Sequence, residues 1–167
     1  MTQRFLFDAS SILVLAEIGY LEFFCDTIPI FTTTSVIINE VTQKLTPSKK
    51  IVEDLVIKGK IFVLSLEVTS HTSYSLYFKL GLHLGEISLL VAANQKTDII
   101  VIDDLVARSV ARAEGVPFTG LLGLLVALKK AGKVSQETAL AILLAITKTN
   151  FRLSVSLYNA IRTELES

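Results

Sequence analysis

Apolar residues follow two patterns along this chain. Short runs of phenylalanine, leucine, isoleucine and valine predict strands at residues 5–7, 28–32, 61–64, 99–102 and 116–119. Between these runs, apolar residues recur every three or four positions, as they do on one face of a helix. Strands that alternate with helices form βαβ units, so the pattern predicts an α/β fold with a central, mainly parallel sheet of about five strands.

The predicted helices fall into two groups. Helical patterns accompany the strands at residues 12–24, 36–45, 47–58, 69–82 and 86–93, and a further helix after the fourth strand is expected to end near Gly115. After residue 120 the pattern predicts helices only, at residues 121–131, 135–146 and 154–165, with Ser135 and Ser154 as N-caps. No linker or repeat divides the sequence. We therefore expect a single domain over residues 1–167, in which residues 133–167 form a helical C-terminal extension.

Two of the predicted strands end abruptly in acidic residues. Asp8 directly follows the first strand, and the adjacent pair Asp103 and Asp104 follows the fourth. Neighbouring carboxylates repel each other and resist burial, so they usually face solvent, cap a helix or bind a cation. The carboxyl ends of parallel strands meet at one edge of the sheet, where ligands bind. These acids are therefore expected to share that edge.

The composition narrows the classes of function. Of the 167 residues, 51% are hydrophobic and 19% charged, which is typical of a globular domain. The apolar excess is explained either by an aliphatic core or by a homodimer or higher homo-oligomer. The 16 basic and 16 acidic side chains cancel, so nucleic acid would have to bind through a local surface. The single Cys25 excludes an intrachain disulfide and favours a cytoplasmic location. The sequence predicts no membrane span and no signal peptide.

Two further acids interrupt apolar helical patterns. Glu40 lies among the apolar residues of the segment 36–45, and Glu86 lies in the first turn of the segment 86–93. Any one of these acids alone is more commonly a helix cap or a solvated charge. Carboxylates that converge without histidine or cysteine partners form a hard oxygen site that suits Mg²⁺ or Mn²⁺. Such ions bind phosphate oxygens and lower the pKa of water, which points to a nuclease.

The acid-containing segments resemble those of the PIN-domain family and occur in the same order. The matching segments are residues 7–11, 36–41, 84–90 and 101–108, and residues 118–125 and 150–154 resemble a prokaryotic subgroup with extra C-terminal helices. The resemblance implies a three-layer α/β/α fold and a metal-dependent endoribonuclease, like the toxins of prokaryotic toxin-antitoxin pairs. It also implies an RNA substrate, a Mg²⁺ or Mn²⁺ cofactor, a small antitoxin protein as a partner, and dimerisation.

The same resemblance implies a set of site residues. The catalytic residues would be Asp8, Ser10, Glu40, Glu86, Asp103 and Asp104, and the metal ligands among them Asp8, Glu86, Asp103 and Asp104. Ser10 would orient the first carboxylate or a water molecule. The subgroup often has a threonine directly after the glycine that corresponds to Gly120, where this chain has Leu121. A hydroxyl role at that position is therefore in doubt, and Thr119 is the nearest substitute.

Arg108 and His83 each have two interpretations. Arg108 lies four residues after Asp104, which slightly favours an ordinary i,i+4 ion pair over a nucleic-acid-binding role at an RNA phosphate. His83 precedes Glu86 by three residues and would approach a metal or donate a proton. No second histidine completes a ligand pattern, which favours a structural or surface role for His83.

Two other functions are weighed against the nuclease. A PIN-fold protein without catalysis would serve as an RNA-binding or scaffold protein, although the presence of all four acidic motifs argues for activity. A phosphoacceptor domain also places acids at strand ends, but it requires an acidic pair after the first strand and a lysine after the last. Here Ala9 follows Asp8, and Gly120 follows Thr119, so the phosphoacceptor function ranks low.

Overall fold

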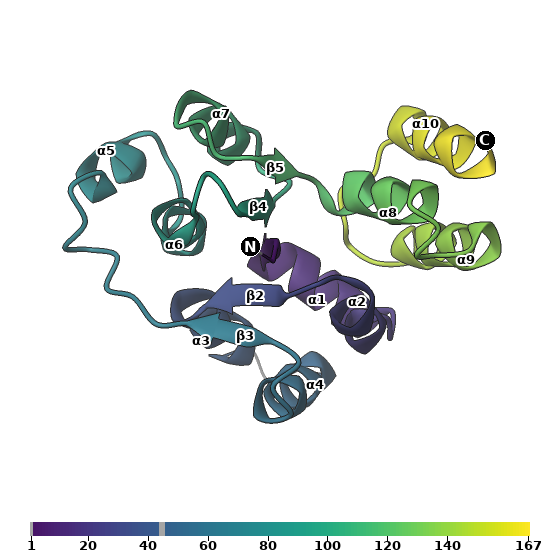
Figure 1. The fold of residues 1–167 in the computed structure, drawn as a ribbon, viewed down its shortest axis with the longest axis horizontal. Helices are drawn as coiled ribbons and strands as arrows, with labels where there is room; N and C mark the ends of the chain where they lie inside the picture. The colour runs from purple at the N-terminus through teal and green to yellow at the C-terminus, as the bar shows by residue number, and fades with distance from the viewer. Residues whose placement is uncertain (1, 44–45) are drawn as a thin grey trace.

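A parallel sheet of five strands forms the centre of the computed structural model, which describes residues 2–43 and 46–167. The strand order is β3-β2-β1-β4-β5 (Figure 1). The strands are β1 Arg4–Phe7, β2 Phe31–Thr34, β3 Phe62–Leu64, β4 Asp98–Val101 and β5 Phe118–Thr119. The central strand β1 pairs in parallel with β2 on one side and with β4 on the other. The predicted α/β class and the parallel sheet are thus confirmed, and β5, which Pro117 directly precedes, lies at an edge of the sheet.

Helices lie between the strands along the chain and flank the sheet, and three more follow the last strand (Figure 1). They are α1 Ala9–Glu17, α2 Leu21–Thr27, α3 Ser35–Gln43, α4 Pro47–Ile57, α5 Tyr74–Lys79, α6 Leu84–Ala92, α7 Leu105–Ala113, α8 Leu121–Lys130, α9 Gln136–Ile146 and α10 Val155–Glu166. The last three helices gather together in space (Figure 1). No helix in the described ranges has both the length and the apolar character of a membrane span.

The predicted N-caps of the C-terminal helices are confirmed. The side chain of Ser135 accepts a hydrogen bond from the Thr138 N–H, and that of Ser154 accepts one from the Leu157 N–H. Each bond satisfies a backbone donor that the first turn of a helix leaves without a partner. Local sequence therefore determines where α9 and α10 begin.

The predicted helix over residues 12–24 is wrong, because two helices occupy this region. Gly19 has a φ of +77°, a conformation that favours glycine, and it ends α1 before α2 begins at Leu21. The predicted helix over residues 69–82 is also too long. Only α5 forms there, and Gly81, with a φ of +90°, follows its end. The predicted end of α3 at Leu45 lies outside the described residues.

The second strand lies further along the chain than predicted. Residues 28–30 precede it, and Thr33 and Thr34, which follow the predicted strand, belong to β2 and are fully buried. Their hydroxyls find partners inside the protein: Thr33 Oγ1 donates to the Phe7 carbonyl at 2.9 Å, and Thr34 Oγ1 lies 2.6 Å from Ser88 Oγ. Threonine is β-branched, so once its hydroxyl is satisfied it suits a buried strand. Thr34 Oγ1 also accepts from the Ile37 N–H at 3.3 Å and so still caps α3.

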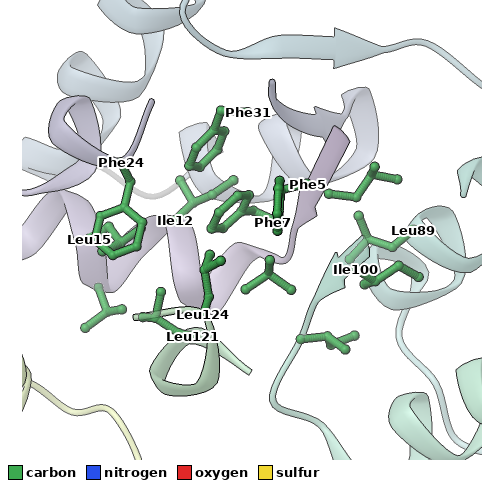
Figure 2. Close-up of a cluster of buried hydrophobic side chains, with 14 of the residues drawn as sticks. Phe5, Phe7, Ile12, Leu15, Phe24, Phe31, Leu89, Ile100, Leu121 and Leu124 are labelled. Carbon is green, nitrogen blue, oxygen red and sulfur yellow. The ribbon is translucent and has the colours of Figure 1, made fainter. Parts of the chain in front are cut away.

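The core fixes the end of β1. Phe7 is fully buried and stacks on Phe31 of β2, with the ring centroids 3.8 Å apart. Figure 2 shows Phe7, Ile12 and Leu121 within one cluster of buried side chains that joins β1, α1 and α8. Because close-packed side chains leave little room for movement, this cluster holds the backbone rigidly where β1 passes into α1.

Candidate active site

Two acids sit where neighbouring strands pass into helices. Asp8 follows β1 and caps α1, and its Oδ1 accepts from the Ser11 N–H at 2.8 Å. Asp104 lies between β4 and α7 and caps α7, with its Oδ1 accepting from the Ala107 N–H at 2.8 Å. The Asp8 N–H also donates to the carbonyl of Val101, the last residue of β4, at 3.1 Å. The expected meeting of these acids at one sheet edge is thus explained by parallel pairing of β1 with β4.

The other two acids come from α3 and α6. Glu86 lies in the first turn of α6, and its Oε2 accepts from the His83 N–H at 2.8 Å. Glu40 of α3 reaches the same helix start, because a Cβ on Gly85 would lie only 3.0 Å from Glu40 Oε2. The buried contact between Thr34 and Ser88 ties the start of α3 to α6 nearby. These helices therefore hold Glu40 and Glu86 close together.

One pocket of about 170 Å³ brings the four acids together. Its lining includes Asp8, Glu40, Glu86 and Asp104, together with Ser10, Ala9, Ile37, His83 and Gly85. Ser10 Oγ donates to Asp8 Oδ2 at 2.9 Å. His83, for which the sequence favours a structural or surface role, is also part of this lining. The sequence feature that indicates its place in the pocket is its position at the start of the helix that carries Glu86.

Asp103 lies beside this pocket and does not line it. Its Oδ1 accepts from Arg108 Nη2 at 2.7 Å, and its Oδ2 accepts from the Leu121 N–H at 3.4 Å. The favoured ion pair between Arg108 and Asp104 is therefore wrong. Asp104 turns its Oδ1 toward the first turn of α7, whereas Arg108 folds back to the preceding acid. Spacing alone does not reveal this choice between two adjacent carboxylates.

Comparison with known families agrees with the fold. A family model described as a PIN domain matches residues 4–167. The chain belongs to the PIN-domain family. We found no match among curated proteins and none among solved structures. PIN domains are generally nucleases and typically use divalent metals, so the family resemblance seen in the acidic motifs is confirmed at this level.

Burial and mutual repulsion raise the pKa values of three acids in and beside the pocket of this PIN domain. Burial raises the pKa of Asp8, against the opposing effect of its hydrogen bonds from Ser11 and Ser10. Burial also raises the pKa of Glu86, and the nearby charges of Asp104 and Asp8 raise it further. The pKa of Asp103 is raised by burial and by the charge of Asp8. Without a cation, the PIN domain therefore holds these carboxylates at a cost in stability.

We expect Asp8→Asn to raise the melting temperature of the metal-free PIN domain by several degrees at neutral pH. Because its pKa is higher in the folded state, Asp8 binds a proton more readily there than in the unfolded chain. Stability therefore falls as the pH rises from about 4, the ordinary pKa of aspartate, through the folded-state pKa. Asparagine removes the charge and still caps α1. Calorimetry across this pH range measures the difference.

The pH dependence distinguishes this effect from a general change in packing. The gain in melting temperature should shrink as the pH falls through the folded-state pKa of Asp8 and vanish below about 4, where Asp8 is protonated in both states. The matched control is Glu137→Gln, which removes an exposed acid from the first turn of α9 and should not raise the melting temperature. A lower melting temperature for Asp8→Asn at neutral pH would contradict the prediction.

The carboxylate oxygens of the pocket are the kind of ligand atom that divalent ions bind. Within residues 2–43 and 46–167, no three side chains of the ligating types are already arranged around a common ion position. Asp104 and Glu86 nevertheless each use one oxygen in a helix-start hydrogen bond and keep a second oxygen without such a bond to the described residues. Hard oxygen donors of this kind are those that Mg²⁺ and Mn²⁺ prefer. The acids would have to close together to bind an ion.

Proposed function

We propose that this PIN domain is a metal-dependent endoribonuclease that hydrolyses RNA phosphodiester bonds with Mg²⁺ or Mn²⁺. The observation that carries this proposal is the pocket in which Asp8, Glu40, Glu86 and Asp104 meet. These acids come from four separate stretches of chain, and Asp8, Glu86 and Asp104 are each anchored to a helix start. Such anchoring holds carboxylates close together despite their repulsion, as a cation site requires.

Each residue of the pocket has a role in this proposal. Asp8, Glu86 and Asp104 would hold the ion, and Ser10 orients Asp8 through its 2.9 Å hydrogen bond. When bound, a divalent ion activates water and neutralises charge on the phosphate. Glu40, whose Oε2 lies near Gly85 at the pocket wall, would accept hydrogen bonds from water or assist the other acids. The products would carry a 5′-phosphate and a 3′-hydroxyl.

The cellular role that we propose follows from the family resemblance. The extra C-terminal helices are similar to those of a prokaryotic PIN subgroup, which favours a toxin of a toxin-antitoxin pair in the cytoplasm. A small antitoxin protein would then be a partner, and the chain would form a homodimer or higher homo-oligomer. The neighbouring reading frame tests the toxin role: a small upstream protein with a basic DNA-binding pattern would support it.

One observation favours a second candidate, a PIN-fold RNA-binding or scaffold protein without catalysis. The acids of the described residues are not closed around an ion position. The two functions are distinguished by incubating the protein with labelled RNA in the presence of Mn²⁺ and, in parallel, of a chelator. The nuclease predicts cleavage with Mn²⁺ only and none by Asp8→Asn. Stable RNA binding without cleavage in any of these mixtures would favour the second candidate.

A further inference from the structure

Asp103 and Asp104, the adjacent acids that follow β4, have different surroundings. Asp104 lines the acidic pocket and caps α7, whereas Asp103 faces Arg108 and the start of α8. Consecutive residues in extended backbone send their side chains to opposite sides, which explains the divergence. The structure therefore separates two carboxylates that look equivalent in the sequence.

Arg108 bridges the turn that contains both acids. Its Nε donates to the Ile102 carbonyl at 2.8 Å, and its Nη2 donates to Asp103 Oδ1 at 2.7 Å. The Ile102 N–H in turn donates to the Thr119 carbonyl of β5 at 2.9 Å. Both charged side chains are about seven-tenths buried, at 27% and 31% exposed, so the pair is shielded from much of the solvent. One guanidinium thus connects the sheet edge to the residue before Asp104.

Gly120 provides the space for this ion pair. A Cβ at this position would lie 2.2 Å from Arg108 Nη2 and 2.4 Å from Asp103 Oδ1, far inside contact distance. Its φ of −89° is accessible to any residue, so backbone conformation gives no reason for glycine here. The reason for glycine is the close approach of the ion pair, which leaves no room for a Cβ. This contact packs together the β4–α7 connection, α7 and the start of α8.

We propose that Arg108 is a positioning residue, which fixes the β4–α7 turn through Asp103 and Ile102 and so holds Asp104 in the pocket. Asp103 then serves as the anchor for Arg108, and the ion contacts the other acids. This inference rests on the proposed function where it concerns metal and RNA. Its structural part, the ordering of the Asp104 turn by Arg108, stands without either.

The decisive substitution is Arg108→Lys, which keeps the charge but loses the fork that reaches two acceptors. We expect it to weaken Mn²⁺ binding about 10-fold in titration calorimetry, as loss of support behind a metal ligand does. We also expect kcat to fall and KM for RNA to stay constant. A lysine binds phosphate as a point charge. If Arg108 only contacted RNA, Arg108→Lys would leave Mn²⁺ affinity unchanged, and that result would overturn the proposal.

Two further variants examine the partners of Arg108. Gly120→Ala changes neither charge but displaces the pair, so it should reproduce the loss seen in Arg108→Lys. Asp103→Asn keeps the acceptor oxygen and should weaken Mn²⁺ binding less than Asp104→Asn does. Equal losses in those two aspartate variants would make Asp103 a ligand and overturn its assignment as an anchor. The matched control is Arg112→Lys, one turn further along α7, where Arg112 lies over the Phe118 ring.

Amide hydrogen exchange tests the inference without metal or RNA. The Ala107 N–H donates to Asp104 Oδ1, so its exchange rate reports whether the turn stays closed. In the metal-free full chain, Arg108→Lys should accelerate this exchange about 10-fold, and Arg112→Lys should not. An unchanged rate in Arg108→Lys would overturn the positioning role. If the wild type binds no Mn²⁺ and cleaves no RNA, the proposed function fails, while this rate still decides the inference about Arg108.

Discussion

Replacing Asp104 with asparagine is expected to lower kcat/KM for RNA cleavage at least about 100-fold, because the lost charge removes about 3 kcal/mol of stabilisation from the transition state. Asp104 lines the acidic pocket, and its free oxygen is the one available to an ion. Asparagine has a side-chain oxygen that still caps α7, so the fold should be retained. Steady-state kinetics on a labelled RNA with Mn²⁺ measure the loss, and circular dichroism checks the fold.

The control for this prediction is an acid in a similar local setting elsewhere. Glu137 lies exposed in the first turn of α9, outside the pocket lining, and Glu137→Gln should cleave RNA at the wild-type rate. Glu86→Gln should show a loss comparable to Asp104→Asn. Full activity in both pocket variants would mean that RNA cleavage does not depend on these carboxylates.

Mg²⁺ or Mn²⁺ is expected to raise the melting temperature of the wild-type protein by about 5–10 °C. An ion at 100 times its dissociation constant stabilises the folded state by about 2.7 kcal/mol, which gives a shift of this size for a chain of this length. The cause is relief of repulsion among acids that burial has already made costly to ionise. Differential scanning fluorimetry with metal and with chelator, at equal ionic strength, measures the gain.

The same measurement on Asp104→Asn shows whether the gain comes from the pocket. This variant should retain only a small part of the shift, since one ligand charge is missing. Glu137→Gln should retain all of it. Equal melting curves of the wild type with metal and with chelator would contradict a metal site in this protein.

Local signals were sufficient to predict much of the site. An apolar run broken by an acid marks both the end of a strand and the N-cap of the next helix, and Asp8 and Asp104 carry both signals. Glu86 occupies the first turn of α6, where an acid is favoured by the helix dipole. Parallel strands with helices between them then place such positions at one edge. The strand and helix pattern therefore predicts that these acids share one edge of the sheet, whereas their roles at a metal site were predicted from the family resemblance.

Long-range contacts explain what the local pattern did not predict. The Thr34 hydroxyl meets Ser88, 54 residues away, and β2 extends to Thr34, beyond the strand predicted at residues 28–32. Asp103 accepts a hydrogen bond from the Leu121 N–H at the start of α8, 18 residues away. This contact holds Asp103 where Arg108 pairs with it and not with Asp104. The break at Gly19 depends on a positive φ that an amphipathic pattern does not reveal. In the first two cases the deciding partner lies far away in the sequence, and in the third it is the backbone conformation of one glycine.

The most direct test of the central claim is anomalous diffraction from crystals of the full chain soaked in Mn²⁺. We predict a peak inside the acidic pocket, within about 2.5 Å of carboxylate oxygens of Asp8, Glu86 and Asp104. Asp103 should stay paired with Arg108 in the same crystals. A pocket without a peak at saturating Mn²⁺, or a peak bound only outside it, would contradict the account.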